Sequence, residues 1–143
     1  MRNSTSIVTR DSIANQKWLT LAFKALSDST RLRIVRLLAA NAAEMCVCEI
    51  VDVLQVRQYT VSRGLGLLEQ AGLVQGQKDG RWVYYSLSNR GDTVVSALYE
   101  FVASVSDSDD VFLLDQERFR QRMALREDGR CRVGIQTQDL IER

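Results

Sequence analysis

The stretch that decides the fold is residues 55–87, QVRQYTVSRGLGLLEQAGLVQGQKDGRWVYYSL. Its first part predicts a helix over residues 58–71, because apolar side chains recur there at helical spacing and Gly72 then supplies a stop signal. Polar side chains lie on a second stripe of the same helix. The apolar stripe consists of Val61, Leu65 and Leu68, and the polar stripe consists of Gln58, Tyr59, Ser62, Arg63 and Gly66.

A second short helix precedes this one. It starts in the sequence EMCVCEI, residues 44–50, and ends near Leu54, and residues 55–57 connect the two helices. Two short helices joined by a short turn, the second with an apolar back and a polar front, are typical of a helix-turn-helix. The polar front would enter the major groove of DNA, where Arg63 could contact guanine or phosphate. A solvated helix surface is the alternative interpretation.

A β-hairpin is predicted directly after the helix-turn-helix. Asp79-Gly80 separates two strand-like runs, residues 73–78 and 81–87, and Asp-Gly is a strong hairpin signal because both turn positions favour positive φ. A helix-turn-helix followed by a hairpin is a winged helix. Lys78 and Arg81 flank the turn, where they could contact phosphate.

Helical spacing also appears before and after this unit. The fold class expected is therefore mainly α, a winged helix-turn-helix with a two-stranded β-hairpin wing. The further helices are predicted over residues 16–27, 30–40, 94–105 and 111–126. Three regions are expected: a flexible N-terminal arm over residues 1–15, a DNA-binding and dimerisation domain over residues 16–106, and a C-terminal helix and loosely structured tail over residues 107–143, preceded by an acidic break at residues 106–110.

The composition excludes several classes of function. The chain has no histidine, which removes the commonest general base and most zinc sites. No apolar run approaches the roughly 20 residues of a membrane span, and the first residues lack the apolar core of a secretory signal. A cytoplasmic protein with reduced thiols is therefore expected. Residues 1–90 carry twelve Lys and Arg against seven Asp and Glu, which suits a polyanionic partner, although a mixed-sign solvated surface explains the imbalance equally well.

Two of the three cysteines, Cys46 and Cys48, are separated by one residue. In an ideal helix, positions i and i+2 lie about 200° apart around the axis, so both sulfurs can meet one ion only if the start of the helix is loosened. Thiolates select soft, thiophilic ions, which makes the pair a candidate ligand site. The alternative is small apolar filler, since cysteine is often buried, although two cysteines at this spacing point in different directions and cannot both fill the core on the same face.

Four motifs in series point to one family. They are ALSDSTRLRI at residues 25–34, TVSR at 60–63, LEQAGLV at 68–74 and GRWVYYSL at 80–87. Over about residues 18–100 the chain resembles the ArsR/SmtB family of bacterial metal-responsive repressors. The stretch around Cys46 and Cys48 resembles the arsenic-binding motif of the arsenical-resistance members. The zinc-sensing members use histidines on the dimer-forming helix, which this chain lacks.

The resemblance implies a repressor with no catalytic residues, in which trivalent arsenic or antimony acts as the inducer. It implies a homodimer that binds double-stranded operator DNA and leaves it when the inducer binds. The first helix and residues 94–105 are the candidates for the dimer interface, unless those faces complete the core of the monomer. The expected DNA-binding residues are Gln58, Tyr59, Thr60, Ser62 and Arg63 in the recognition helix, and Lys78 and Arg81 in the wing.

The third ligand is a separate hypothesis. Arsenite and antimonite favour three thiolates in a pyramid, and some relatives carry a third cysteine where this chain has Val51. Cys131 is the one further cysteine in the sequence, so we expect it to complete the metal site with Cys46 and Cys48, from the same or the partner subunit. Water, or the organic group of a methylated arsenical, is the alternative third partner.

Gathering Cys46 and Cys48 onto one ion would distort the start of the helix that supports the recognition helix. We therefore expect the DNA-bound form to hold these sulfurs apart, because a ligand shifts an equilibrium only through its differential affinity for the two states. Three rival functions are a thiol-oxidation sensor, a cadmium or lead sensor of the same fold, and a thiol-dependent arsenate reductase. The reductase is disfavoured because the sequence has no Cys-x5-Arg motif.

Overall fold

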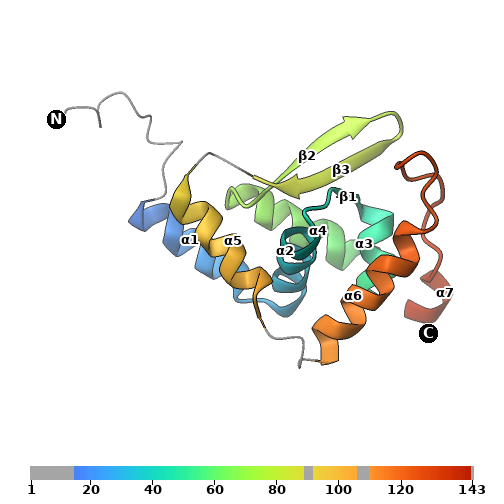
Figure 1. Ribbon diagram of the computed structural model, residues 1–143, viewed down its shortest axis with the longest axis horizontal. Helices are drawn as coiled ribbons and strands as arrows, with labels where there is room; N and C mark the ends of the chain where they lie inside the picture. The colour runs from blue at the N-terminus through green and yellow to red at the C-terminus, as the bar shows by residue number, and fades with distance from the viewer. Residues whose placement is uncertain (1–14, 89–91, 106–109, 143) are drawn as a thin grey trace.

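A helix-turn-helix and a β-wing form the centre of the protein, and the C-terminal segment packs beside them (Figure 1). The computed structural model describes residues 15–88, 92–105 and 110–142. The predicted arm, residues 1–15, lies outside the described residues except for Asn15. The elements are α1 (Gln16–Leu26), α2 (Ser29–Asn41), β1 (Met45–Cys46), α3 (Val47–Leu54), α4 (Gln58–Gln70), β2 (Val74–Asp79), β3 (Trp82–Leu87), α5 (Thr93–Ala103), α6 (Asp110–Met123) and α7 (Gln138–Ile141).

Side-chain caps set the starts of the first two helices. The Asn15 side chain accepts a hydrogen bond from the Trp18 backbone N–H at 2.9 Å, and the Asp28 side chain accepts one from that of Arg31 at 3.0 Å. Such caps satisfy backbone donors that have no partner within the helix. The predicted helices at residues 16–27 and 30–40 are confirmed to within one residue at each end.

The buried helix α2 holds the other helices together. It packs against α1, α4, α5 and α6, and its Ile34 and Val35 are fully buried. Gly64 lies on the buried side of α4, where a Cβ would make ordinary van der Waals contacts with the side chains of Arg31 and Ile34, at 3.4 and 3.6 Å. Gly66 is exposed. The central apolar core includes Leu37, Leu38, Ile50, Val53, Val61, Leu65, Leu68 and Leu73.

The wing has three strands, where the sequence predicted two. β2 and β3 pair across a turn at Gly80, whose φ is +65°, as the Asp-Gly signal indicates. β1 pairs with the other edge of β3, with Met45 opposite Tyr85 and Cys46 opposite Tyr84. A two-residue strand is too short to produce an alternating pattern, which is why β1 could not be predicted from the sequence. As a result, Cys46 belongs to the same sheet as the wing hairpin.

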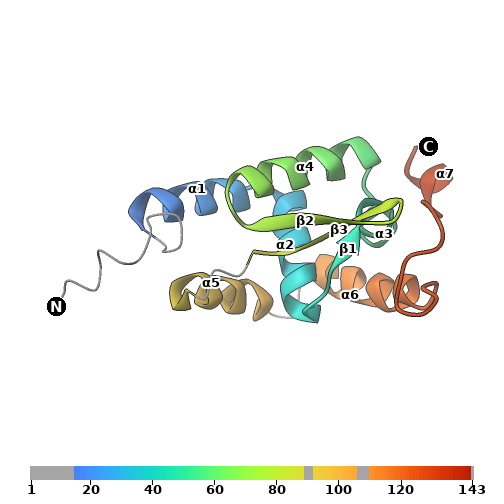
Figure 2. The same cartoon turned by 90° about the horizontal axis from the view of Figure 1, so that it is seen from above.

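The C-terminal segment lies along the helix-turn-helix. Arg33 on α2 pairs with Asp115 on α6 at 2.8 Å and also donates to the Leu54 carbonyl at the end of α3. The predicted helix over residues 111–126 is confirmed but ends at Met123, and the acidic break lies outside the described residues except for Asp110. After α6 the chain reaches the wing tip and returns to α7, which the sequence did not predict (Figure 2).

Helices α1 and α5 have one buried and one exposed apolar face. On α5, Val95, Leu98 and Val102 are buried, whereas Phe101 is 68% exposed. On α1, Phe23 is 56% exposed. These helices complete the monomer core and also leave apolar side chains uncovered. Among the described residues, no helix has the length and apolar character needed to cross a membrane.

Candidate thiol centre and nucleic-acid interface

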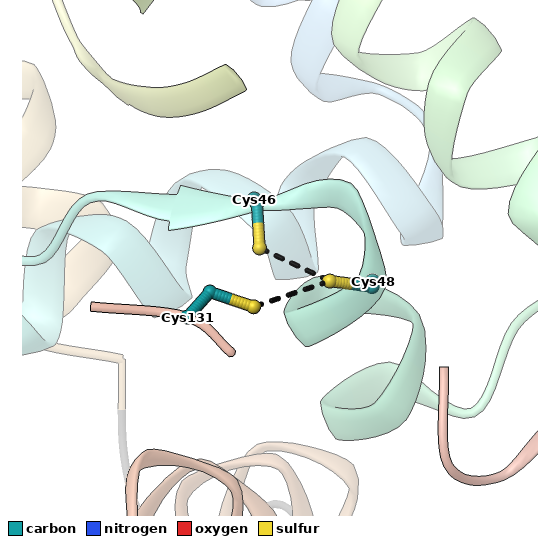
Figure 3. A group of neighbouring side chains, drawn as sticks. All are labelled: Cys46, Cys48 and Cys131. Atoms are coloured by element: carbon teal, nitrogen blue, oxygen red, sulfur yellow. Dashed lines mark hydrogen bonds between the residues drawn. The ribbon is translucent and has the colours of Figure 1, made fainter. Parts of the chain in front are cut away.

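Three sulfur atoms lie together next to the start of α3. The Cys46 and Cys48 sulfurs are 3.1 Å apart, and the Cys48 and Cys131 sulfurs are 3.5 Å apart (Figure 3). All three lie within 4.8 Å of one another. The three cysteines singled out from the sequence are therefore brought together, and a single chain supplies all of them.

A break in the backbone lets Cys46 and Cys48 face each other. Cys46 ends β1 with extended dihedrals of φ −86° and ψ 166°, and α3 begins at the next residue. Cys46 therefore lies outside the helix, while Cys48 lies in its first turn. Glu49 completes the cap by accepting a hydrogen bond from the Cys46 backbone N–H at 3.1 Å. This arrangement meets the geometric requirement that the start of the helix be loosened.

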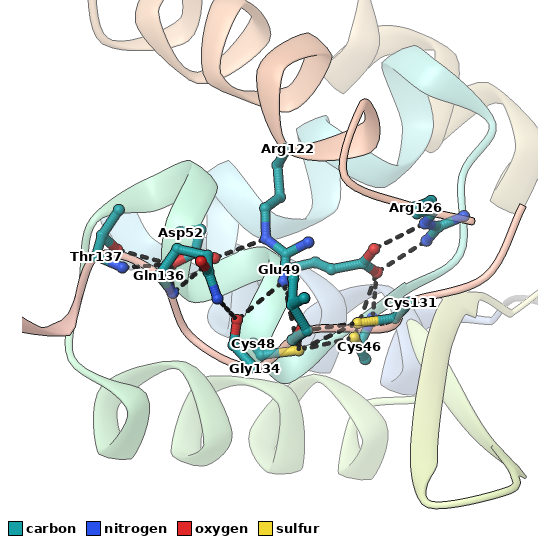
Figure 4. A network of polar contacts seen from close by, with 11 residues as sticks. Cys46, Cys48, Glu49, Asp52, Arg122, Arg126, Cys131, Gly134, Gln136 and Thr137 are labelled. Carbon is teal, nitrogen blue, oxygen red and sulfur yellow. Dashed lines mark hydrogen bonds and ion pairs between the residues drawn. The ribbon is translucent and has the colours of Figure 1, made fainter.

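Cys131 is held by its neighbours, although the tail has little regular structure. The Cys131 backbone N–H donates to the Tyr84 hydroxyl at 2.8 Å. Arg122 donates to the carbonyl groups of Val133 and Gly134 at 2.9 and 3.2 Å (Figure 4). The prediction of a loosely structured tail is therefore wrong around Cys131, where long-range hydrogen bonds replace secondary structure.

Two buried ion pairs connect α3 to the C-terminal segment (Figure 4). Arg126 contacts both carboxylate oxygens of Glu49 at 2.7 and 2.8 Å. Arg122 contacts Asp52 at 2.6 Å and lies 3.8 Å from the Cys48 sulfur. Burial alone would raise the pKa of Glu49, but hydrogen bonding and charge from Arg126 outweigh it and lower that pKa. Glu49 is therefore ionised inside the protein.

Asp52 also organises the end of the tail. It accepts hydrogen bonds from the backbone N–H groups of Gln136 and Thr137, at 2.9 and 3.0 Å. Sequence analysis missed Asp52, Arg122 and Arg126. Their spacing was the available signal. Glu49 and Asp52 lie three residues apart and share a face of α3. Arg122 and Arg126 lie four residues apart within the predicted helix over residues 111–126, although α6 ends at Met123 and Arg126 follows it.

The three thiols are buried, and two of them hold their protons more strongly than a free cysteine does. Cys46 and Cys131 are at most 1% exposed, and Cys48 is 7% exposed. The hydrogen bond with Cys48, burial and the charge of Glu49 raise the pKa of Cys46, and burial raises the pKa of Cys131. The tail contacts this cluster through Cys131 and through the Val133 carbonyl, which lies 3.6 Å from the Cys48 sulfur.

The donor set suits a small centre with three sulfur ligands. In a tetrahedral zinc site with Zn–S bonds of about 2.3 Å, sulfur atoms lie roughly 3.8 Å apart. The two shortest separations here, 3.1 and 3.5 Å, are smaller. Glu49, the nearest carboxylate, is engaged by Arg126. The three cysteines therefore offer a set of three sulfur donors, which suits a thiophilic ion.

The residues predicted to bind DNA lie on the surface of α4 and of the wing. Tyr59 is 72% exposed, and the Arg81 guanidinium stacks 4.6 Å from the centre of the Trp82 ring. The buried stripe of α4 faces α2 and α3, which leaves the polar stripe open. The exposed residues are Gln58, Tyr59, Thr60, Ser62 and Arg63 on α4, with Lys78 and Arg81 on the wing.

These features define a winged helix-turn-helix protein with a cluster of three thiols beside its wing. Residues 28–75 match the family described as "Bacterial regulatory protein, arsR family". The chain is 43% identical over 79 residues to an uncharacterised HTH-type transcriptional regulator of Methanocaldococcus jannaschii, a match that covers 54% of this chain and 88% of that protein. The chain belongs to the arsR family and is a transcriptional regulator. Cys131 lies beyond the family match.

Two further relatives carry names that refer to metal resistance. The arsenical resistance operon repressor of Escherichia coli is 47% identical over 66 residues, which cover 46% of this chain and 56% of that protein. A cadmium resistance regulatory protein CadC homolog of Staphylococcus aureus is 40% identical over 67 residues, which cover 47% of this chain and 54% of that protein. The chain thus spans about half the length of each of these two relatives.

Solved structures agree with this fold. Reduced HlyU from Vibrio cholerae matches with a TM-score of 0.54 and 31% identity, covering 62% of this chain and 87% of that one. The homodimeric winged helix-turn-helix DNA-binding domain from Mycobacterium bovis matches with a TM-score of 0.54 and 29% identity, covering 64% and 81%. These relatives are transcriptional regulators, in agreement with the prediction that the chain is not an enzyme.

Proposed function

We propose that this regulator is a repressor that binds operator DNA as a homodimer and releases it when trivalent arsenic or antimony binds Cys46, Cys48 and Cys131. The observation that carries the proposal is the gathering of the three sulfurs within 4.8 Å of one another. The arsenical-resistance relative supports the choice of ligand. The proposed setting is the cytoplasm, where thiols are kept reduced.

The chemistry of arsenite matches buried, protonated thiols. Arsenous acid, As(OH)3, condenses with three thiols so that three As–S bonds form and three As–O bonds break. Each departing hydroxyl takes one thiol proton and leaves as water. Arsenic stays trivalent, no net proton is released and the product is neutral. A neutral product avoids the cost of burying an unpaired charge.

Binding of cadmium or lead would leave the site with a different net charge and would release protons. A divalent ion must displace the thiol protons, and three thiolates around it leave a net charge of −1. The nearby Arg122 is already neutralised by Asp52, so that charge would be buried without a partner. The site therefore favours a trivalent metalloid. Divalent ions are the second candidate, because one relative is named for cadmium resistance.

The proposed DNA-recognition surface is the polar stripe of α4. Gln58, Tyr59, Thr60, Ser62 and Arg63 would enter the major groove, while Lys78 and Arg81 of the wing would contact the DNA backbone. All seven side chains are exposed. Replacing Arg63 with alanine is expected to reduce the preference for operator over unrelated DNA.

The dimer would cover the exposed apolar side chains of α1 and α5. Phe23 and Phe101 are 56% and 68% exposed, and the related domain from Mycobacterium bovis is homodimeric. Two copies would require operator half-sites one helical turn, or a multiple of it, apart. Sedimentation of Phe23→Asp and Phe101→Asp variants tests this assignment, and a monomeric wild-type chain would contradict it.

The coupling runs from the thiols to α4 through α3. Cys46 and Cys48 lie on either side of the first residue of α3, and α3 packs directly against α4. A metalloid that fixes both sulfurs fixes the start of α3, whereas the form that binds DNA is expected to hold these sulfurs apart. The ligand then favours release through its differential affinity for the two states.

The decisive experiment measures binding to a duplex from the upstream region of the gene, with and without arsenite. We expect arsenite to release the wild-type protein. Cys46→Ser and Cys48→Ser should bind the duplex normally but fail to respond. If either variant cannot bind DNA, the cysteines are structural and the proposal is wrong.

Two further measurements distinguish arsenite sensing from the alternative functions. Between pH 6 and 8 the affinity for arsenite should stay constant, whereas the affinity for cadmium should rise with pH because its binding releases protons. Release by peroxide in the absence of any metalloid would instead favour a thiol-oxidation sensor. The peroxide measurement is needed because the Cys46 and Cys48 sulfurs lie only 3.1 Å apart.

A further inference from the structure

A second basic surface lies beside the wing, on the C-terminal tail. A hollow of about 270 Å³ opens between the wing tip and the tail. It combines cationic side chains from both segments with the rings of Trp82 and Tyr84. Its lining residues are Asp79, Gly80, Arg81, Trp82, Tyr84, Arg130 and Arg132.

The charges of this surface are unequally neutralised. Arg130 pairs with Glu44 and with Asp79, and it also stacks 3.9 Å from the centre of the Tyr84 ring. Arg132 and Arg81 are exposed, and among the described residues no carboxylate pairs with either of them. The surface therefore presents free positive charge, while Arg130 fixes the tail to the wing.

The position of this surface indicates its partner. Arg130 ties one end of the tail to the wing tip, and Ile135, Gln138 and Ile141 line a small hollow together with Arg57 and Gln58 at the start of α4. The tail thus spans the space between the two elements proposed to contact DNA. Figure 2 shows all three at the same end of the molecule.

We propose that the tail binds the phosphate backbone of DNA through Arg132, as an extension of the wing surface of Arg81. This inference rests on the proposed DNA binding and adds a segment outside the winged helix to it. Cationic side chains that contact phosphate supply affinity without reading sequence. Arg132 is therefore expected to strengthen binding to operator and unrelated DNA equally.

The third cysteine fixes the position of this arginine. Cys131 is fully buried whereas Arg132 is exposed, so consecutive residues of the tail point inward and outward. The hydrogen bond from the Cys131 backbone to Tyr84 holds the segment against β3 at 2.8 Å. The residue that contacts the metalloid and the residue that contacts phosphate would thus be neighbours in the chain.

The test is the salt dependence of DNA binding by the full-length chain. For each phosphate contact, the logarithm of the affinity falls with the logarithm of salt concentration with a slope of about 0.9. Because the proposed dimer carries two copies of Arg132, Arg132→Ala should lower the slope by about 1.8 on operator and on unrelated duplex alike, and Arg132→Lys should restore it. The matched control is Arg120→Ala, which removes the same charge from an exposed arginine paired with Glu117 on α6 and should leave the slope unchanged.

The possible results separate the two proposals. If Arg132→Ala binds the operator with the wild-type slope, the proposed contact between the tail and DNA is wrong, and the proposed function stands. If Arg120→Ala lowers the slope as much, the effect reflects the net charge of the protein, and the proposed contact between the tail and DNA is again wrong. If the wild-type chain binds no duplex at any salt concentration, the proposed function fails, and the tail surface fails with it.

Discussion

The Cys48 and Cys131 sulfurs lie 3.5 Å apart although 83 residues separate them in the sequence. This proximity depends on the path of α6 and the tail, which Arg33, Arg122 and Arg126 connect to the winged helix. The C-terminal segment is therefore an integral part of the candidate sensor.

Replacing Cys131 with serine should reduce the number of sulfurs bound to arsenic from three to two. Loss of a residue that only orients a metal ligand costs about 10–100-fold in affinity, so loss of a ligand should cost at least as much. X-ray absorption counts the As–S bonds, and titration gives the affinity. Unchanged coordination by three sulfurs would rule out Cys131 as a ligand.

Replacing Arg126 with methionine should destabilise the fold by about 3 kcal/mol, because it leaves a buried carboxylate without its partner. Glu49 is fully buried and its pKa is lowered by Arg126 against the effect of burial. Urea unfolding measures the loss. The double variant with Glu49→Gln should recover much of it, and Arg120→Met, an exposed control, should cost less than 1 kcal/mol. Equal losses in Arg126→Met and Arg120→Met would contradict the role of this pair.

The free energy of unfolding should fall as the pH rises above about 9, the ordinary pKa of the cysteine thiol. The pKa values of Cys46 and Cys131 are raised in the folded state, so the unfolded chain loses these protons first. Their contribution is complete below pH 9 and is lost above it, at about 1.4 kcal/mol per pH unit for each thiol. Chemical unfolding of the wild type and of a Cys46→Ser, Cys131→Ser variant under reducing conditions isolates this term. Parallel pH profiles for the two proteins would show that the thiols are not responsible.

Loosening the contact between tail and wing should speed the entry of the metalloid. The sulfurs are buried beneath the tail, and Arg130 fixes that tail to Glu44 and Asp79. Arg130→Ala should increase the association rate of arsenite by about two- to fivefold, a modest factor because exposed ion pairs are weak. Stopped-flow fluorescence of Trp82, which packs beside the thiol cluster, follows the reaction. An unchanged rate would mean that the ion enters by another route.

The winged helix could be predicted from the sequence because its signals are local. The apolar stripe of α4 and the Asp-Gly turn each depend on residues close together in the chain. β1 and α7 are two and four residues long, which is too short for a periodic pattern.

The candidate site could be predicted only in part. The spacing of Cys46 and Cys48 indicated a ligand pair, and Cys131 was a candidate because the sequence contains no fourth cysteine. Its proximity depends on tertiary contacts such as that between Arg126 and Glu49, which join residues 77 positions apart. No single-sequence pattern specifies such a pairing, although the three-residue spacing of the acids on α3 and the four-residue spacing of Arg122 and Arg126 are compatible with it.

All three sulfurs of the cluster belong to one chain. Each subunit would therefore hold a self-sufficient detector, able to capture its ion before meeting a second subunit. A mixed pair with one damaged tail would keep one working detector, which makes its response to arsenite a direct measure of how many loaded subunits are needed to leave DNA.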